Sequence, residues 1–419
     1  MYSLDSAKDL DALIDAMGNK KVVMLGEASH GTHEYYTWRT AITKRLIREK
    51  GFSFITVEGD WPDCYEINKY IKSYKESGDN IQAILRKFDR WPTWMWGNWE
   101  IAALAQWLRI HNQNFHPDKK VGFYGLDVYS LWDSMRNMME YLSKEDSAAA
   151  VMVKKAIRCF EPYRENEQLY AFSTKSGFSC RDEVINLLKE IKLRAQHLDG
   201  DREAALNTEQ NAAIAVNAER YYRSMTGFNN ESWNVRDLHM METLRRVMNF
   251  HGSDAKAIVW EHNTHIGDAH ATDMHDAGMV NTGGLAREEY GRDNVFLAGF
   301  GSYEGTVMAG EEWGAPMQEM TLPPAREGSI EQRLHRESKK NRYYIFNDHH
   351  DNSIFDGRIH HRAVGVVYDP ARERYGNYVP SVMRERYDAF IYIDETSALH
   401  PVPAHTEDQK IPETYPFGV

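Results

Sequence analysis

Carboxylate and imidazole side chains follow one apolar run after another along this 419-residue chain. These residues are Glu27 and His30 after KVVMLG (21–26), Glu58 after FSFITV (52–57), Asp127 after VGFYGL (121–126), and His262 and His265 after KAIVW (256–260). If the runs are strands of one parallel sheet, their carboxyl ends share an edge, which is where α/β proteins bind ligands. We therefore expect one polar cluster at that edge.

A histidine beside a carboxylate can activate water. The carboxylate holds one imidazole nitrogen and makes the other more basic, and such a general base contributes typically 10²–10⁴-fold in rate. His30 is the candidate base, with Glu27 or Glu58 as the carboxylate that orients it. His262 or Arg39 would stabilise the negative charge of a tetrahedral intermediate. The pattern favours hydrolysis.

Each of these residues also has a plainer interpretation. A carboxylate after a strand is commonly a helix N-cap or part of a solvated turn. Arg39 could form a surface ion pair. Gly26 and Gly31 would let the chain bend from strand to helix, which would place Glu27 and His30 at the helix N-terminus.

A metal-dependent hydrolase is the alternative. Its ligands would be Glu27, His30, Glu58, His262 and His265. These nitrogen and oxygen donors suit Zn²⁺, but the spacing from His262 to His265 differs from the i, i+4 pair of a zinc-binding HExxH helix. His239 and Glu242 could also suggest a carboxylate metal site, although we expect a surface pair there.

A binding module without catalysis is the third hypothesis. Tryptophans are dense between Trp91 and Trp99, and Trp94 could stack on a sugar or a polyketide ring. Core packing is the competing explanation for these rings. The module would bind a ligand without turning it over.

The elements that must position these residues alternate between strand and helix. Apolar runs predict strands, and they are 21–27, 52–59, 121–127, 256–262, 294–301, 342–347, 363–369 and 388–394. Apolar periodicity predicts helices over 32–50, 99–111, 181–197 and 209–225. We predict an α/β fold with a mostly parallel or mixed sheet flanked by helices, a helical insertion and a strand-rich C-terminal part. The core would comprise 1–130 and 251–419, with the insertion at 131–250.

The composition limits the partners. The chain is 42% hydrophobic and 27% charged, as in ordinary globular proteins. Its net charge of −12 argues against binding nucleic acid or anionic membranes. We expect no signal peptide and no membrane span. With three cysteines and no Cys-x-x-Cys pair, we expect no disulfide scaffold and a cytoplasmic location. A small molecule is the expected partner, and the oligomeric state stays open.

Six motifs in order resemble the erythromycin esterase family. They are GEASHGTHEYY (26–36), VEGDW (57–61), GLDVYS (125–130), WNVRDLHMMETL (233–244), VWEHNTHIGDA (259–269) and YDAFIYIDETSALHP (387–401). The resemblance covers about residues 10–402. It implies ester hydrolysis by histidine-activated water without a covalent serine intermediate, and some members of the family open macrolide lactones. It implies no cofactor, with a divalent metal as the alternative.

The resemblance also assigns roles to individual positions. His30 matches the general base and Glu27 its partner. The remaining matches are Arg39 and Glu58 in the cleft, the later histidines His262 and His265, and Arg236 with Asp237 in the Arg-Asp motif. GEASH (26–30) differs slightly from some macrolide-inactivating members, which leaves the substrate open. Asp127 and Trp94 are added here from strand position and aromatic clustering.

Overall fold

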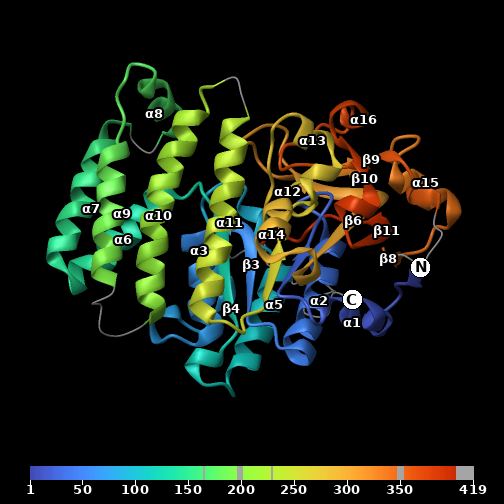
Figure 1. Cartoon of the computed structure of the whole chain (residues 1–419), viewed down its shortest axis with the longest axis horizontal. Coiled ribbons are helices and arrows are strands. Elements are labelled where there is room, and N and C mark those ends of the chain that lie inside the picture. Colours follow the sequence, from blue (N-terminus) through green and yellow to red (C-terminus); the bar gives the residue numbers. More distant parts are fainter. Residues whose placement is uncertain (164–165, 196–201, 228–229, 347–352, 403–419) are drawn as a thin grey trace. The chain divides into compact units, whose positions relative to one another are not determined.

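The computed structural model describes residues 1–163, 166–195, 202–227, 230–346 and 353–402 (Figure 1). Their contacts divide the chain into two compact units. The first unit comprises 1–57, 66–123 and 254–419, and the second comprises 58–65 and 124–253. The domain boundaries expected from the sequence, at 130 and 251, stay a prediction.

A nine-stranded mixed sheet forms the centre of the fold, in the order β1-β8-β11-β6-β2-β5-β3-β4, with β7 paired to β6. The strands are β1 Tyr2–Ser3, β2 Val22–Leu25, β3 Phe54–Asp60, β4 Gly122–Asp127, β5 Ala257–Trp260, β6 Val295–Ala309, β7 Gln318–Leu322, β8 Arg342–Ile345 and β11 Ala389–Thr396. Strand β2 runs parallel to both β5 and β6, and β3 runs parallel to β5. Strand β8 runs antiparallel to β1 and to β11. The predicted α/β class is confirmed.

Burial explains why the central strands are parallel. Every residue of β2 and β5 is buried, so both faces of the sheet are covered and the strands read as unbroken apolar runs. The helices of the first unit, with α3 shared between the two units, are α1 Asp11–Met17, α2 His33–Lys50, α3 Trp61–Lys72, α4 Ile81–Leu85, α5 Trp99–Asn112, α12 Asn263–Ile266, α13 Asp273–Asp276, α14 Thr282–Tyr290, α15 Ile330–Glu337, α16 Glu373–Gly376 and α17 Met383–Arg386. Helix α2 ends at Gly51, which has the left-handed φ of 70° that favours glycine.

Seven of the eight predicted strands contain a strand, and one prediction is wrong. Residues 363–369 form no strand; β9 Arg358–Arg362 and β10 Tyr378–Val382 pair with each other on either side of them. The apolar residues Val364 and Tyr368 pack as a loop against Val307 of β6 and Leu322 of β7. An apolar run therefore marked burial here without marking a strand.

The second unit is mainly helical in its described part, and it also includes the ends of β3 and β4. Its helices are α6 Leu131–Glu145, α7 Ser147–Phe160, α8 Glu167–Thr174, α9 Arg181–Ala195, α10 Arg202–Ser224 and α11 Glu231–His251. Helix α10 contacts α6, α9 and α11, and Figure 1 shows these long helices side by side in green to yellow. The predicted helix over 209–225 begins earlier than expected, at Arg202. The end of the helix predicted over 181–197 lies outside the described residues.

A disulfide bond joins Cys159 in α7 to Cys180, which directly precedes α9. The sequence predicted no disulfide scaffold, and it did not predict this single bond. Cys64 is a free, buried thiol. Disulfides persist in oxidising compartments, so this bond does not favour the cytoplasmic location, which stays a prediction. Among the described helices, none has the length and apolarity needed to cross a bilayer.

Reducing the Cys159–Cys180 bond is expected to destabilise the helices that it links. The bond closes a loop over a sequence separation of 21 residues. In the chain-entropy model, a loop of this length contributes about 3 kcal/mol to the free energy of unfolding. Urea unfolding with and without dithiothreitol measures the loss. The same reagent should leave the double variant Cys159→Ala, Cys180→Ala unchanged, and an unchanged wild-type midpoint would contradict the expectation.

A buried histidine in α11 makes the stability of the fold depend on pH. His239 is 1% exposed, so the surface interpretation of this residue is wrong. The Asn217 side-chain amide donates a 2.8 Å hydrogen bond to His239 Nδ1. Burial, reinforced by the charge of Arg246, lowers the pKa of His239 from 6.5 to about 3. The folded state therefore holds the imidazole neutral.

Acidification is expected to destabilise the protein through His239. Between pH 6.5 and about 3 the unfolded chain binds a proton that the folded state excludes, so stability falls as the pH falls. From pH 7 to pH 5 the loss from this group is about 2 kcal/mol. Urea unfolding of wild type and His239→Gln at both pH values isolates it. The exposed-site variant His116→Gln should behave as wild type; a His239→Gln variant with undiminished pH dependence would refute the assignment.

Candidate active site

The loop from β2 to α2 carries the first predicted cluster, and close packing dictates its glycines. A Cβ on Gly26 would lie 2.1 Å from Asn263 Oδ1, and one on Gly31 would lie 1.9 Å from the Met308 carbonyl oxygen. Close approach, not a left-handed backbone, explains both glycines. Helix α2 begins at His33. Glu27 and His30 therefore lie in the loop before the helix, not at its N-terminus as expected.

Glu27 is the centre of the cluster. Its side chain is 1% exposed, and Oε1 accepts a 2.9 Å hydrogen bond from His30 Nδ1. Oε2 accepts a 2.5 Å charged hydrogen bond from Arg39 Nη2. Because Nδ1 of His30 donates to Glu27, Nε2 is the nitrogen that can accept a proton. Of the two carboxylates considered for orienting His30, the structure places Glu27 in that position.

Arg39 is fully buried, so the surface ion pair considered from the sequence is wrong. Its guanidinium carbon lies 4.5 Å from the Tyr36 ring centroid and 4.7 Å from that of Trp260. Both distances are within the range of cation–π attraction. These rings and Glu27 hold Arg39 in place. Its position suits orienting Glu27 more than contacting a substrate.

The His262 ring lies beside the candidate base, tilted by 39° to the His30 ring. The His30 and His262 ring centroids are 4.8 Å apart. His262 is the N-cap of α12, and its Nδ1 accepts from the Thr264 backbone N–H at 3.3 Å and lies 2.8 Å from Thr264 Oγ1. With Nδ1 accepting, a neutral His262 carries its proton on Nε2. The two histidines therefore have opposite polarity, one able to accept a proton and the other able to donate a hydrogen bond.

Asn263 bonds this loop to the sheet, a role that we did not predict for it from its motif. Its amide donates to the Phe300 carbonyl at 2.7 Å and to His361 Nε2 at 3.1 Å. His361 Nδ1 donates in turn to Glu331 at 2.6 Å, and both residues of this hydrogen-bonded pair are fully buried. His265, three residues after His262 and within α12, is also buried. Its predicted role in binding substrate stays a prediction.

Glu58, Asp127 and Arg236 form a second cluster, within the second unit. Arg236 donates to both oxygens of Asp127, from Nε at 2.9 Å and from Nη2 at 2.6 Å. Nη2 also donates to Glu58 at 2.7 Å. Its guanidinium carbon lies 4.9 Å from the Tyr129 ring centroid. The structure thus brings the carboxylates of Glu58 and Asp127 together around the Arg236 guanidinium, and all three residues were predicted from the sequence.

Charge pairing overcomes burial in this second cluster. Burial alone would raise the pKa of Asp127. The Arg236 guanidinium lowers this pKa by more than burial raises it, so the net pKa is below the usual 3.8. Asp127 therefore stays ionised at neutral pH.

Asp237, the next residue of the Arg-Asp motif, is fully buried in α11.

Trp94 lies in the core and is 1% exposed. Its ring therefore offers no open face for stacking in this structure, and core packing is the better explanation of its burial. Trp91 instead meets Trp313, with ring centroids 4.7 Å apart, and Trp313 is largely exposed. The predicted contact between Trp94 and substrate stays a prediction that its burial does not favour.

Sequence reasoning missed one group with metal-ligand geometry. In the part of the chain that the structure describes, His33, Glu100 and His400 have potential ligand atoms within 4.8 Å of one another. His33 and His400 both lie inside motifs already noted, GEASHGTHEYY (26–36) and YDAFIYIDETSALHP (387–401). Their separation of 367 positions gave no reason to pair them. This set differs from the five ligands expected from the sequence.

Known proteins share both the sequence pattern and the fold. The putative hydrolase YbfO of Bacillus subtilis is 22% identical, over 93% of this chain and 86% of its own length. Erythromycin esterase type II of Escherichia coli is 22% identical, over 79% of this chain and 81% of its own length. A crystal structure of a Bacillus cereus protein, 20% identical, covers 95% of this chain and 96% of that chain with a TM-score of 0.77, which shows a common fold.

The family match decides the classification. The erythromycin esterase family model matches residues 47–396, most of the chain. The described β2–α2 and β5–α12 loops lie within two of the six motifs that resemble this family in the sequence. The chain belongs to the erythromycin esterase family.

Proposed function

We propose that this protein hydrolyses a carboxylic ester with water activated by His30. The observation that carries the proposal is the buried chain of contacts from Arg39 through Glu27 to His30 Nδ1. It leaves Nε2 of His30 as the basic nitrogen and supplies a carboxylate to stabilise the imidazolium that forms. His262, 4.8 Å away between ring centroids, supplies a hydrogen-bond donor.

The reaction proceeds in two steps. His30 Nε2 removes a proton from water as the water oxygen bonds to the ester carbonyl carbon, which gives a tetrahedral intermediate. His262 Nε2–H donates a hydrogen bond to the developing oxyanion. The intermediate then expels the alkoxide, which takes the proton from His30 as its bond to carbon breaks. The products are a carboxylic acid and an alcohol, and His30 is neutral again.

The proposal also covers the role of Arg39 and the class of ester substrate. Arg39 acts as a positioning residue, because it contacts Glu27 and two aromatic rings. Macrolide lactones are the first substrate class to test, since one relative bears the name erythromycin esterase type II. A lactone is a cyclic ester, so the same two steps would open its ring. No step requires a cofactor.

Replacing the base is expected to abolish most of the activity. His30→Asn keeps a polar side chain but loses the basic nitrogen, so kcat/KM on an aryl ester should fall on the order of 10²–10⁴-fold. His116→Asn, at an exposed position, should retain wild-type turnover. Steady-state hydrolysis of p-nitrophenyl acetate and of erythromycin measures both. Full activity of a folded His30→Asn variant would disprove the proposed base.

Removing the proposed oxyanion donor should affect kcat more than KM. Its hydrogen bond strengthens only as charge develops, so His262→Ala should lower kcat on the order of 10²–10³-fold, with KM changed little. The loss should be the same over the plateau of the pH–rate profile, because His262 acts here as a neutral donor. A rise in KM at unchanged kcat would show instead that His262 contributes ground-state binding.

A further inference from the structure

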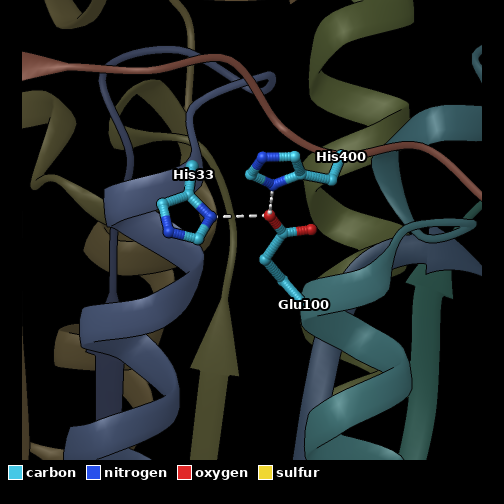
Figure 2. Close-up of side chains that lie close together, drawn as sticks. All are labelled: His33, Glu100 and His400. Atoms are coloured by element: carbon cyan, nitrogen blue, oxygen red, sulfur yellow. Dashed lines mark hydrogen bonds and ion pairs between the residues drawn. The ribbon is translucent and has the colours of Figure 1, made fainter. Parts of the chain in front are cut away.

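Three side chains from distant parts of the first unit converge outside the proposed catalytic cluster. His33 opens α2, Glu100 lies in the first turn of α5, and His400 follows β11. Figure 2 shows both imidazoles directed at the same carboxylate oxygen. His33 Nδ1 lies 2.6 Å from Glu100 Oε1, and His400 Nδ1 lies 2.7 Å from it. The convergence places two nitrogens and one carboxylate together.

Backbone pairing fixes this arrangement. The segment after β11 crosses the starts of both helices: His33 N donates to the Ser397 carbonyl at 2.9 Å, and Trp99 N donates to the His400 carbonyl at 2.9 Å. Leu399 N donates to the Gly31 carbonyl at 3.0 Å. The ligand atoms are therefore held by three anchored segments, which reduces the entropic cost of binding an ion there.

The hydrogen bonds within the cluster leave part of it unsatisfied. Both histidines donate to Oε1, whereas Glu100 Oε2 is buried and has no hydrogen-bond partner among the described residues. Glu100 is only 8% exposed. A buried carboxylate oxygen without a partner is costly, and such an exception calls for an explanation such as an ion. This observation, independent of the spacing, points to a missing ligand.

The donor set selects the class of ligand. Two imidazole nitrogens and one carboxylate oxygen are ligands that Zn²⁺ accepts, whereas Mg²⁺ and Ca²⁺ prefer oxygen alone. All three potential ligand atoms lie within 4.8 Å of one another. The His400 side chain is 38% exposed, which gives an ion access from solvent. Glu34 adds negative charge nearby through its bonds to the Ser397 backbone and hydroxyl.

We propose that His33, Glu100 and His400 bind one divalent zinc-type cation. Each imidazole coordinates the ion through Nδ1 as its neutral Nε2–H form, so the proton that Nδ1 donates to Glu100 moves to Nε2, or leaves to solvent if Nε2 already carries one. The carboxylate neutralises half of the ionic charge. The ion joins the segment 397–401 to the starts of α2 and α5. The proposal does not depend on the proposed function, because none of the three ligands is a proposed catalytic residue.

Zinc titration of the full-length, untagged protein tests the site. After treatment with a chelator and its removal, calorimetric titration with Zn²⁺ should give one ion per chain. Co²⁺ should bind at the same stoichiometry and produce the visible absorption of a four-coordinate ion. His400→Gln should weaken Zn²⁺ binding on the order of 100-fold or more, because even residues behind the direct ligands are worth 10–100-fold.

Control variants separate this site from other histidines. His116→Gln and the double variant His349→Gln, His350→Gln should bind Zn²⁺ as wild type does. Far-UV circular dichroism checks folding, and if His400→Gln does not fold, His33→Gln and Glu100→Gln take its place with the same expected loss. Absence of a stoichiometric ion, undiminished affinity in folded ligand variants, or an equal loss in the controls would overturn the proposal.

Discussion

The buried carboxylate of Glu27 is the constraint on which the active-site region depends. Taking a carboxylate and a guanidinium out of water costs several kcal/mol per ion, and only close, well-aligned partners compensate for it. Arg39 meets this requirement from α2, and His30 meets it from the same loop. The aromatic rings of Tyr36 and Trp260 cover the guanidinium faces. The pair is stable only if the loop, the helix and β5 keep their positions.

Close packing of the backbone keeps these elements together. Gly26 and Gly31 leave no space for a side chain, so the loop lies directly against Asn263 and against Met308 of β6. Asn263 then bonds to β6 and to His361, whose partner is the buried Glu331. The loop is thus fixed by a continuous polar network. A buried network of this kind restricts the positions that His30 can adopt.

Local sequence pattern predicts much of this region. It does not predict contacts between residues that are distant in the sequence. The strand ends and the Glu27–His30 spacing were visible because parallel strands are apolar runs and the two residues are three apart. The choice between Glu27 and Glu58 was open because both follow strands; only the tertiary structure shows that Glu58 bonds to Arg236. The apolar run at 363–369 was misleading because a buried loop, which here forms only isolated bridges, can have the same composition as a strand.

Two neighbouring histidines illustrate how the environment gives similar side chains different roles. His30 and His33 are three residues apart, and each bonds through Nδ1 to a buried carboxylate. Glu27 has a permanent cation, Arg39, on its second oxygen, so the pair can bear a proton passing on and off His30. Glu100 has no such cation and instead meets a second imidazole, His400. The difference in the third partner therefore favours proton transfer at the first site and holding a cation at the second.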